Sequence, residues 1–162
     1  MSEISFTVVS ANHIGFDDYD AVHKLLTAEF AYMQNRIDPP SSMNRLDIGK
    51  LREKVESEHL IVALSAEKLV GCVFLKPDAD AWYLGKLAVD GKMRGRGVGQ
   101  ALLEKAESLC AENAADIIEL EVRIELTENH KYFEKHGFVR FAANCHAGYD
   151  KPTSYSYRKR IK

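Results

Sequence analysis

The stretch LAVDGKMRGRGVGQALL, residues 87–103, carries most of the information about how this chain folds and what it binds. It opens with a short apolar run, passes through a turn rich in glycine and ends in apolar positions at helical spacing. Glycine lets backbone N–H groups approach a ligand closely, and the first turn of a helix adds unpaired donors and a positive partial charge. The stretch therefore predicts a strand, a phosphate-binding turn and a helix. Arg94 and Arg96 can add charge-assisted hydrogen bonds to the same oxygens.

Two common phosphate-binding motifs do not fit this turn. A Walker A loop needs Lys followed by Ser or Thr after its last glycine, but here Gln100 and Ala101 follow Gly99. A dinucleotide-binding fingerprint that starts at Gly95 requires a glycine at position 100, and repeated βαβ units are also missing. The pattern that remains is R-x-x-G-x-G, from Arg94 to Gly99.

The hydrophobic pattern of the rest of the chain predicts a mixed sheet. We expect strands at residues 6–9, 59–65, 69–75, 81–89, 117–124, 138–144 and 154–161, with a bulge or close approach at Gly85 in the fourth. We expect four helices. The first follows Asp17 or Asp18 as its cap and carries Val22, Leu25, Leu26, Phe30 and Met33, and the second runs from Ser41 or Ser42 through Val55. The third runs from Val98 through Cys110, and the fourth from Thr127 to Gly137. This order predicts the α/β class, of α+β type, with helices on both faces.

Length and composition favour one soluble domain over residues 1–162. The chain is 46% hydrophobic, enough for a core at this length, and no linker or repeat divides it. Its formal net charge of −2 does not indicate a nucleic-acid partner. One basic cluster, Arg158, Lys159, Arg160 and Lys162, follows Tyr155 and Tyr157, and this alternation predicts an edge strand with charged ends rather than a nucleic-acid tail.

Cysteine usage and the first residues favour the cytoplasm. Cys72, Cys110 and Cys145 lie far apart and form no CxxC pair, which disfavours a zinc site and a secreted disulfide framework. Glu3 stands where a signal peptide would be basic, and no apolar run is long enough to span a bilayer. We therefore expect a cytoplasmic protein with no metal and no membrane partner.

The pattern from Arg94 to Gly99 resembles the pyrophosphate loop of the GCN5-related N-acetyltransferase (GNAT) superfamily, with Arg94, Gly97 and Gly99 at its three defining positions. The order of elements resembles the GNAT fold across nearly the whole chain. The stretch NHKYFEKHGF, residues 129–138, resembles the family's later helix, which has an aromatic pair and ends in Gly-Phe. The resemblance implies a mostly antiparallel central sheet of about six to seven strands.

The resemblance also implies an activity, a cosubstrate and partners. Such enzymes transfer an acyl group, usually acetyl, from acetyl-CoA to a primary amine, here of a small molecule or a peptide. Members of the family often pair through sheet edges, so the resemblance also suggests a homodimer.

The resemblance places the cosubstrate on particular residues. Strand-edge N–H groups of Leu87 and Val89 would bind the pantetheine arm, and that of Ala88 or Leu87 would stabilise the oxyanion. The expected cofactor-binding set is Leu87, Ala88, Val89, Arg94, Gly95, Arg96, Gly97, Val98, Gly99, Asn129 and Phe133. Asn129 lies closer to the Gly-Phe pair than the family's usual asparagine does.

The sequence leaves several candidates for the catalytic acid and the catalytic base. Family members often use a tyrosine four residues before the glycine as the acid, but this position holds Phe133. Tyr132 is the adjacent candidate, although one helical step rotates a side chain by about 100°. Either Tyr132, another residue or water protonates the thiolate. Glu121, Glu125 and His146 are candidate bases near the expected cleft, with Glu121 the one we select.

Acceptor recognition is expected from the early helices. Glu29, Tyr32 and Arg36 lie about one helical turn apart, and an acidic residue there can attract a cationic amine. Because the usual tyrosine is missing, a non-catalytic acyl-CoA binding or sensing module is the alternative function. A nucleic-acid-binding domain is a third interpretation, which the net charge disfavours.

Overall fold

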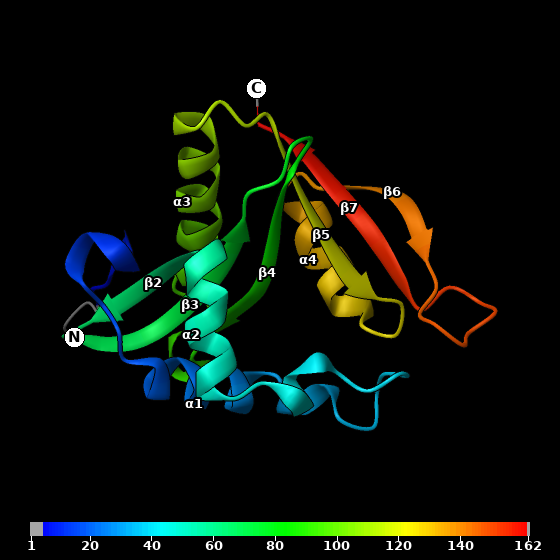
Figure 1. Ribbon diagram of the computed structural model, residues 1–162, viewed down its shortest axis with the longest axis horizontal. Helices are drawn as coiled ribbons and strands as arrows, with labels where there is room; N and C mark the ends of the chain where they lie inside the picture. The colour runs from blue at the N-terminus through cyan, green and yellow to red at the C-terminus, as the bar shows by residue number, and fades with distance from the viewer. Residues whose placement is uncertain (1–4, 162) are drawn as a thin grey trace.

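A computed structural model of the chain describes residues 5–161, whose strands form one seven-stranded sheet in the order β1-β2-β3-β4-β5-β7-β6 (Figure 1). The strands are β1 (Thr7–Ser10), β2 (His59–Ser65), β3 (Lys68–Lys76), β4 (Trp82–Val89), β5 (Ile117–Arg123), β6 (Val139–Asn144) and β7 (Ser154–Arg160). Neighbours in the sheet are antiparallel except β4 and β5, which are parallel. The predicted mixed, mostly antiparallel sheet is confirmed.

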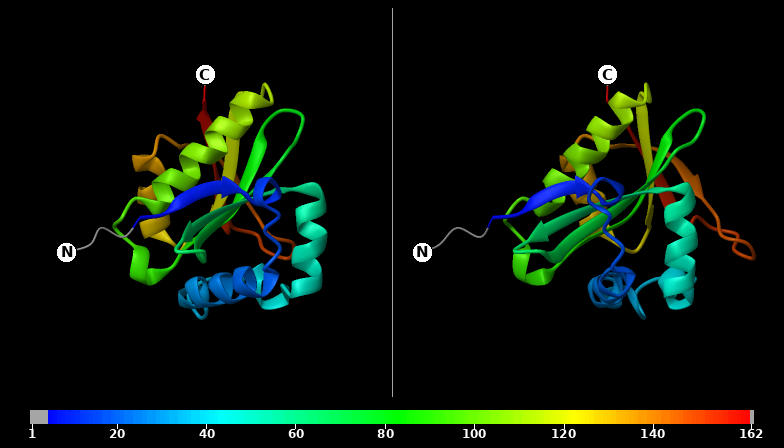
Figure 2. Two further views of the ribbon diagram at one scale, coloured as in Figure 1. Left: turned by 90° about the vertical axis from the view of Figure 1, so that its left-hand side faces the viewer. Right: turned by 60° about the vertical axis from the view of Figure 1, so that its left-hand side comes forward.

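Helices cover both faces of this sheet, as predicted. The helices are α1 (Tyr19–Glu29), α2 (Ile48–Ser57), α3 (Val98–Glu112) and α4 (Thr127–Lys135), with short 3-10 helices η1 (Ala11–Ile14), η2 (Ala31–Met33), η3 (Ser42–Arg45) and η4 (Gly91–Met93). Figure 2 shows α3 on one side of the sheet and α1 and α2 on the other. Alternate residues of β2 and β3 pack into two separate clusters, so both faces of these strands are buried. Burial on both faces explains why their sequences read as continuous apolar runs.

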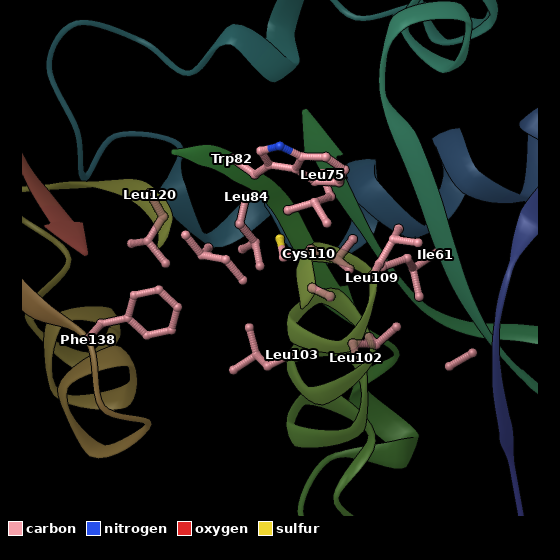
Figure 3. Packing of buried hydrophobic residues seen from close by; sticks show 14 of the residues in the cluster. Ile61, Leu75, Trp82, Leu84, Leu102, Leu103, Leu109, Cys110, Leu120 and Phe138 are labelled. Atoms are coloured by element: carbon pink, nitrogen blue, oxygen red, sulfur yellow. The ribbon is translucent and has the colours of Figure 1, made fainter. Parts of the chain in front are cut away.

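The larger cluster fixes α3 against the centre of the sheet. Figure 3 shows Leu102, Leu103, Leu109 and Cys110 of α3 facing side chains of the central strands, among them Ile61, Leu75, Trp82 and Leu84. Leu102 and Cys110 are fully buried. Because the body of α3 is anchored by this packing, its N-terminus has a fixed position directly after β4.

The predicted end of the first helix is wrong. α1 begins as expected, with the Asp18 carboxylate accepting a hydrogen bond from the Ala21 N–H at 3.1 Å, but it ends at Glu29. Phe30 and Met33 lie beyond it, because a new 3-10 turn starts in which the Met33 N–H donates to the Phe30 carbonyl. An apolar side chain at helical spacing fits such a turn as well as a continued helix.

The predicted N-caps of the second and fourth helices are also wrong. Asp47 caps α2, and its carboxylate accepts from the Lys50 N–H at 2.8 Å. Ser41 instead caps η3, accepting from the Met43 N–H at 3.1 Å. Thr127 is the first residue of α4, whose cap position holds Leu126 and has no side-chain hydrogen bond.

The closing strand is not an edge strand, contrary to prediction. β7 lies between β5 and β6, and its Tyr157 is fully buried. Two of its charged residues have acidic partners: Arg158 pairs with Glu119 at 2.5 Å and Lys159 with Glu107 at 3.1 Å. The edge strand on this side of the sheet is β6 instead.

Some residues of the sequence argument lie outside the described part. Glu3 and Lys162 are among them, so the expectations based on them stay expectations. In residues 5–161, no helix has the length and apolar character needed to cross a bilayer.

A substitution of Gly71 in β3 tests the close contact between the sheet and α3. A Cβ at this position would lie 3.0 Å from Val98 Cγ1 and 3.1 Å from Leu102 Cδ1. We expect Gly71→Ala to lower the free energy of unfolding by about 1–3 kcal/mol through overpacking, measured by chemical denaturation. The matched control is Gly85→Ala in β4, where a Cβ would meet only the Tyr83 ring, at 3.4 Å. Equal stability of the two variants would contradict this packing.

Candidate functional site

The parallel strands β4 and β5 separate soon after they begin. They pair only at Trp82 with Ile118 and at Tyr83 with Glu119, and Figure 1 shows them diverging beyond that point. The edge of β4 that faces β5 therefore has no strand partner over residues 84–89. Buried backbone groups need hydrogen-bond partners, so this edge is available to an extended ligand.

A β-bulge interrupts β4 along the free edge. Cys72 pairs with Ala88 and Phe74 pairs with Gly85, so two residues of β4 stand opposite one residue of β3. The two are Lys86, which has a positive φ of 52°, and Leu87. The predicted bulge is therefore present, one residue beyond Gly85, and it redirects the backbone of the free edge.

A cleft of about 1580 Å³ lies along this edge. It is larger than the roughly 300–1,000 Å³ of a typical small-molecule pocket, so it has room for a long ligand and a second reactant. Of the predicted site residues, the cleft is lined by Leu87, Ala88, Val89, Arg94, Gly95, Gly97, Val98, Gly99, Glu121, Asn129, Tyr132 and Phe133. The structure thus brings together residues from β4, β5, α3 and α4. Arg96 is exposed and does not line the cleft.

The glycine-rich turn forms an open cradle at the start of α3. Gly95 and Gly97 have φ values of 76° and 86°, which favour glycine, and a Cβ at either would meet nothing within 4 Å. Gly97 is the N-cap of α3, and the first turn of α3 carries no acidic side chain. The first N–H groups of α3 have no acceptor within the helix and point into the open space beside Gly95 and Gly97. The cradle suits an anionic group such as a phosphate.

Glu29, at the end of α1, holds the glycine-rich turn. Its carboxylate pairs with the Arg94 guanidinium at 2.7 Å and accepts from the Gly91 N–H at 3.2 Å. Glu29 is therefore committed to the turn, and the structure does not leave it free to attract an amine. The Arg94 side chain remains 64% exposed, so it can still contact an anion in the cradle.

The connection between α1 and α2 crosses to the far side of the cleft. We call residues 31–41 the crossing segment. Its Arg36 pairs with Glu128 of α4 at 2.9 Å, and its Tyr32 hydroxyl accepts from the Asn129 side-chain amide at 2.9 Å. Asn129 is therefore engaged by the crossing segment, although it also lines the cleft as predicted.

The end of β5 holds the same segment. The Arg123 guanidinium donates to the carbonyls of Pro39 and Pro40, at 2.5 Å and 3.2 Å. Next to it, the Glu125 carboxylate accepts from the Asp38 N–H at 3.1 Å. These contacts fix the crossing segment across the wider end of the cleft.

The two adjacent aromatic residues of α4 differ in position. The Phe133 ring packs edge-on against Phe138, with centroids 5.7 Å apart. The Tyr132 ring contacts His136, with centroids 4.5 Å apart, and its hydroxyl lies at the glycine-rich turn, 2.5 Å from where a Gly99 Cβ would stand. The Tyr132 hydroxyl and the Phe133 ring thus lie in different surroundings, as the rotation by one helical step predicts.

Of the acidic residues that line the cleft in residues 5–161, one is without an ion pair. These residues are Glu29, Glu121 and Glu128, and the first and last are paired with Arg94 and Arg36. Glu121, on β5 where the strands separate, is exposed. Its carboxylate is the one in the best position to receive a proton or attract a cation.

The other two candidate bases have different surroundings. Glu125 holds the crossing segment and does not line the cleft. His146 lines the cleft, and its Nδ1 is hydrogen-bonded to the Thr153 hydroxyl. That contact orients the imidazole but leaves its other ring nitrogen available.

Tyr83 and Lys86 are among the cleft residues that sequence reasoning missed. Tyr83, the last β4 residue paired with β5, lines the cleft, and burial together with the Glu121 carboxylate raises the pKa of its hydroxyl to about 12. Lys86, at the bulge, also lines the cleft and donates to the Ser42 hydroxyl at 3.2 Å. Tyr83 and Lys86 line the cleft because of where β4 separates from β5. The local sequence pattern does not show where this separation occurs.

Within residues 5–161, no group of three or more His, Cys, Asp or Glu side chains is arranged to hold a metal ion.

A comparison with known families decides the identity of this fold. The sequence profile described as "Acetyltransferase (GNAT) family" matches residues 19–138, which include the cradle and α4. The chain belongs to the GNAT acetyltransferase family. Among curated proteins, N-alpha-acetyltransferase 30 from Xenopus laevis is 34% identical over 84 residues, which are 49% of this chain and 31% of that protein. The chain thus spans under a third of the length of the curated relatives it matches.

Solved GNAT structures share the fold. An acetyltransferase of the family from Staphylococcus aureus Mu50 aligns with a TM-score of 0.75 at 17% identity, covering 98% of this chain and 100% of that one. A provisionally assigned streptothricin acetyltransferase from Bacillus anthracis, in complex with acetyl coenzyme A, aligns with a TM-score of 0.59 at 23% identity, covering 64% and 62%.

Proposed function

We propose that this GNAT chain is an acetyl-CoA-dependent N-acetyltransferase that acts on a primary amine of a small molecule or a peptide. The observation that carries the proposal is the continuity of the free edge of β4 with the open cradle at the start of α3, in one cleft. An extended arm can add to the edge while its terminal pyrophosphate lies on the helix N-terminus.

The residues present fit this cosubstrate. The cradle offers backbone N–H groups, open space and the exposed guanidinium of Arg94, all suited to a pyrophosphate. The N–H groups of Leu87 and Val89 remain our proposed partners for the pantetheine arm. The complex of the Bacillus anthracis relative with acetyl-CoA supports the choice of ligand.

Direct transfer fits the side chains better than a covalent acyl-enzyme. No cysteine lines the cleft in the described residues, and burial raises the pKa of the Cys72 and Cys110 thiols to about 12. We place the N–H of Leu87 or Ala88, at the bulge, against the negative charge that develops on the thioester oxygen.

Glu121 is our proposed base. It takes a proton from the ammonium form of the acceptor, whose neutral nitrogen then attacks the thioester carbonyl carbon. As the carbon–sulfur bond breaks, the nitrogen loses its second proton to water and becomes the amide. The leaving thiolate receives its proton from water, because Phe133 has none to give. The cationic amine is also attracted by this carboxylate, the one cleft-lining acid of residues 5–161 without an ion pair.

The acceptor class is proposed from the relatives. Similarity to N-alpha-acetyltransferase 30 favours the α-amine of a peptide, and an amine of a small molecule is the second possibility. We further propose that the chain works in the cytoplasm, where its free cysteines stay reduced. If it forms a homodimer, the exposed edge strand β6 is the place for the contact.

A non-catalytic acyl-CoA-binding module is the second candidate. The observation in its favour is Phe133, which occupies the position of the usual acid. Measured turnover separates the two functions, since both predict binding of acetyl-CoA.

Gly97→Glu tests the cradle. It places a bulky anion where the pyrophosphate would bind, so we expect it to abolish the thermal stabilisation by acetyl-CoA that we predict for the wild-type chain. At about 100 times the dissociation constant that stabilisation is roughly 2.7 kcal/mol. The control is Gly15→Glu, at another positive-φ glycine with open space, which should keep it. Unchanged affinity in Gly97→Glu would show the cradle to be misassigned.

Glu121→Gln tests the base. We expect the rate of acetyl transfer at neutral pH to fall about a hundredfold, within the range for loss of a general base, while acetyl-CoA affinity is kept. Glu119→Gln is the matched control, because this residue is on the same strand and is paired with Arg158 outside the cleft. Equal rates for the two variants would exclude Glu121 as the base.

Phe133→Tyr tests whether an acid is missing. If water protonates the thiolate, the added hydroxyl should change the rate less than tenfold, or about 1.4 kcal/mol in barrier. Steady-state kinetics measures this. A much larger gain would favour the non-catalytic alternative for the native chain.

A further inference from the structure

The hydroxyl of Tyr132 is a polar group in the cleft that the proposed reaction does not use. The residue lines the cleft from α4, and its hydroxyl has no hydrogen-bond partner among residues 5–161. Its ring is held on two sides, by Phe133 with centroids 5.3 Å apart and by His136 at 4.5 Å. Because the Tyr132 ring is held in place, its free hydroxyl can donate to a ligand in one direction.

That direction is toward the first turn of α3. A Cβ at Gly99 would lie 2.5 Å from the Tyr132 oxygen but 3.7 Å from the ring carbon that bears it and 3.7 Å from Val89 Cγ2. The hydroxyl alone therefore requires glycine at position 99. Since Gly97, Val98 and Gly99 line the same cleft, the hydroxyl stands at the rim of the cradle.

We propose that the Tyr132 hydroxyl donates a hydrogen bond to a phosphate oxygen of the acetyl-CoA pyrophosphate, and that Gly99 makes the room for it. Tyr132 is then a cofactor-binding residue, not the acid that protonates the thiolate. This assignment rests on the proposed function.

The chemistry of the phenol and the shape of the ligand agree with this assignment. Burial raises the pKa of Tyr132, so its hydroxyl stays protonated and able to donate at neutral pH. A hydrogen bond to an anionic oxygen is stronger than one between neutral groups. The sulfur of acetyl-CoA is separated from the pyrophosphate by the whole pantetheine arm, so a group at the cradle cannot also protonate it.

The test compares two ligands that differ in the pyrophosphate. Dissociation constants of CoA and of pantetheine, which lacks the nucleotide and its phosphates, are measured by calorimetry on wild type and Tyr132→Phe. We expect about a tenfold loss of CoA affinity, in line with one hydrogen bond to a charged group, and no change for pantetheine. Tyr157→Phe is the matched control: it removes a phenol that donates to Glu134 and does not line the cleft.

Two results would overturn the assignment. Wild-type CoA affinity in Tyr132→Phe would show that the hydroxyl makes no contact. An equal loss for CoA and pantetheine would place its effect at the arm, not at the pyrophosphate. If Tyr132→Phe instead kept CoA affinity and lost turnover, Tyr132 would be the acid.

A double-mutant cycle tests the part played by Gly99. In Gly99→Ala the new methyl group must displace the hydroxyl, so we expect the same loss of CoA affinity as in Tyr132→Phe. The double variant should be no worse than Tyr132→Phe alone, because both changes act through one group. An additive loss would contradict the proposal. Thermal melts of each variant without ligand verify that it is folded.

CoA binding by the wild-type chain distinguishes a failure of this inference from a failure of the proposed function. If wild type does not bind CoA, the proposed function fails. If wild type binds CoA and the Tyr132 variants bind it equally well, only the present inference fails.

Discussion

The separation of β4 from β5 after two parallel residue pairs is the constraint on which the rest of this structure depends. It leaves backbone groups of β4 without strand partners, and such groups need hydrogen bonds from elsewhere. α3 starts just after the same strand and is anchored by its packed body, so its N-terminus stands at the end of the free edge. The free edge of β4 and the N-terminus of α3 thus form one continuous binding surface.

Several polar contacts keep the two halves of the sheet apart. Glu29 joins α1 to the turn after β4, while Arg36 and Arg123 join the crossing segment to the side of β5 and α4. Exposed ion pairs contribute little each, but a set of fixed contacts on both sides of a gap defines its width. The cleft is therefore a property of the whole chain and not of one loop.

The parts of this arrangement that could be predicted from the sequence are those encoded locally. The glycine-rich turn, the apolar runs of β2 and β3 and the face of α3 each follow from spacing within a short window. The interior place of β7 comes from its ladders with β5 and β6, in which Arg158 meets Glu119, 39 residues away, and the pairing of Glu29 with Arg94 spans 65 residues. Tyr83 was missed for the same reason, because its place in the cleft depends on where β4 separates from β5. The cap at Asp47 is local, and it was missed because Ser41 offered a competing cap, which belongs to η3.

The two segments at the wider end of the cleft differ from the rest of the protein in how they tolerate change. Residues 31–47 and 145–152 have no buried side chain and include no α-helix or strand. Exposed side chains there can be exchanged with little effect on the core, whereas Met33, Ile37, Met43 and Leu46 pack against it, and the cradle and β4 are constrained by packing on α3. The wider end of the cleft can therefore change its exposed side chains while the cradle and the free edge of β4 stay as they are.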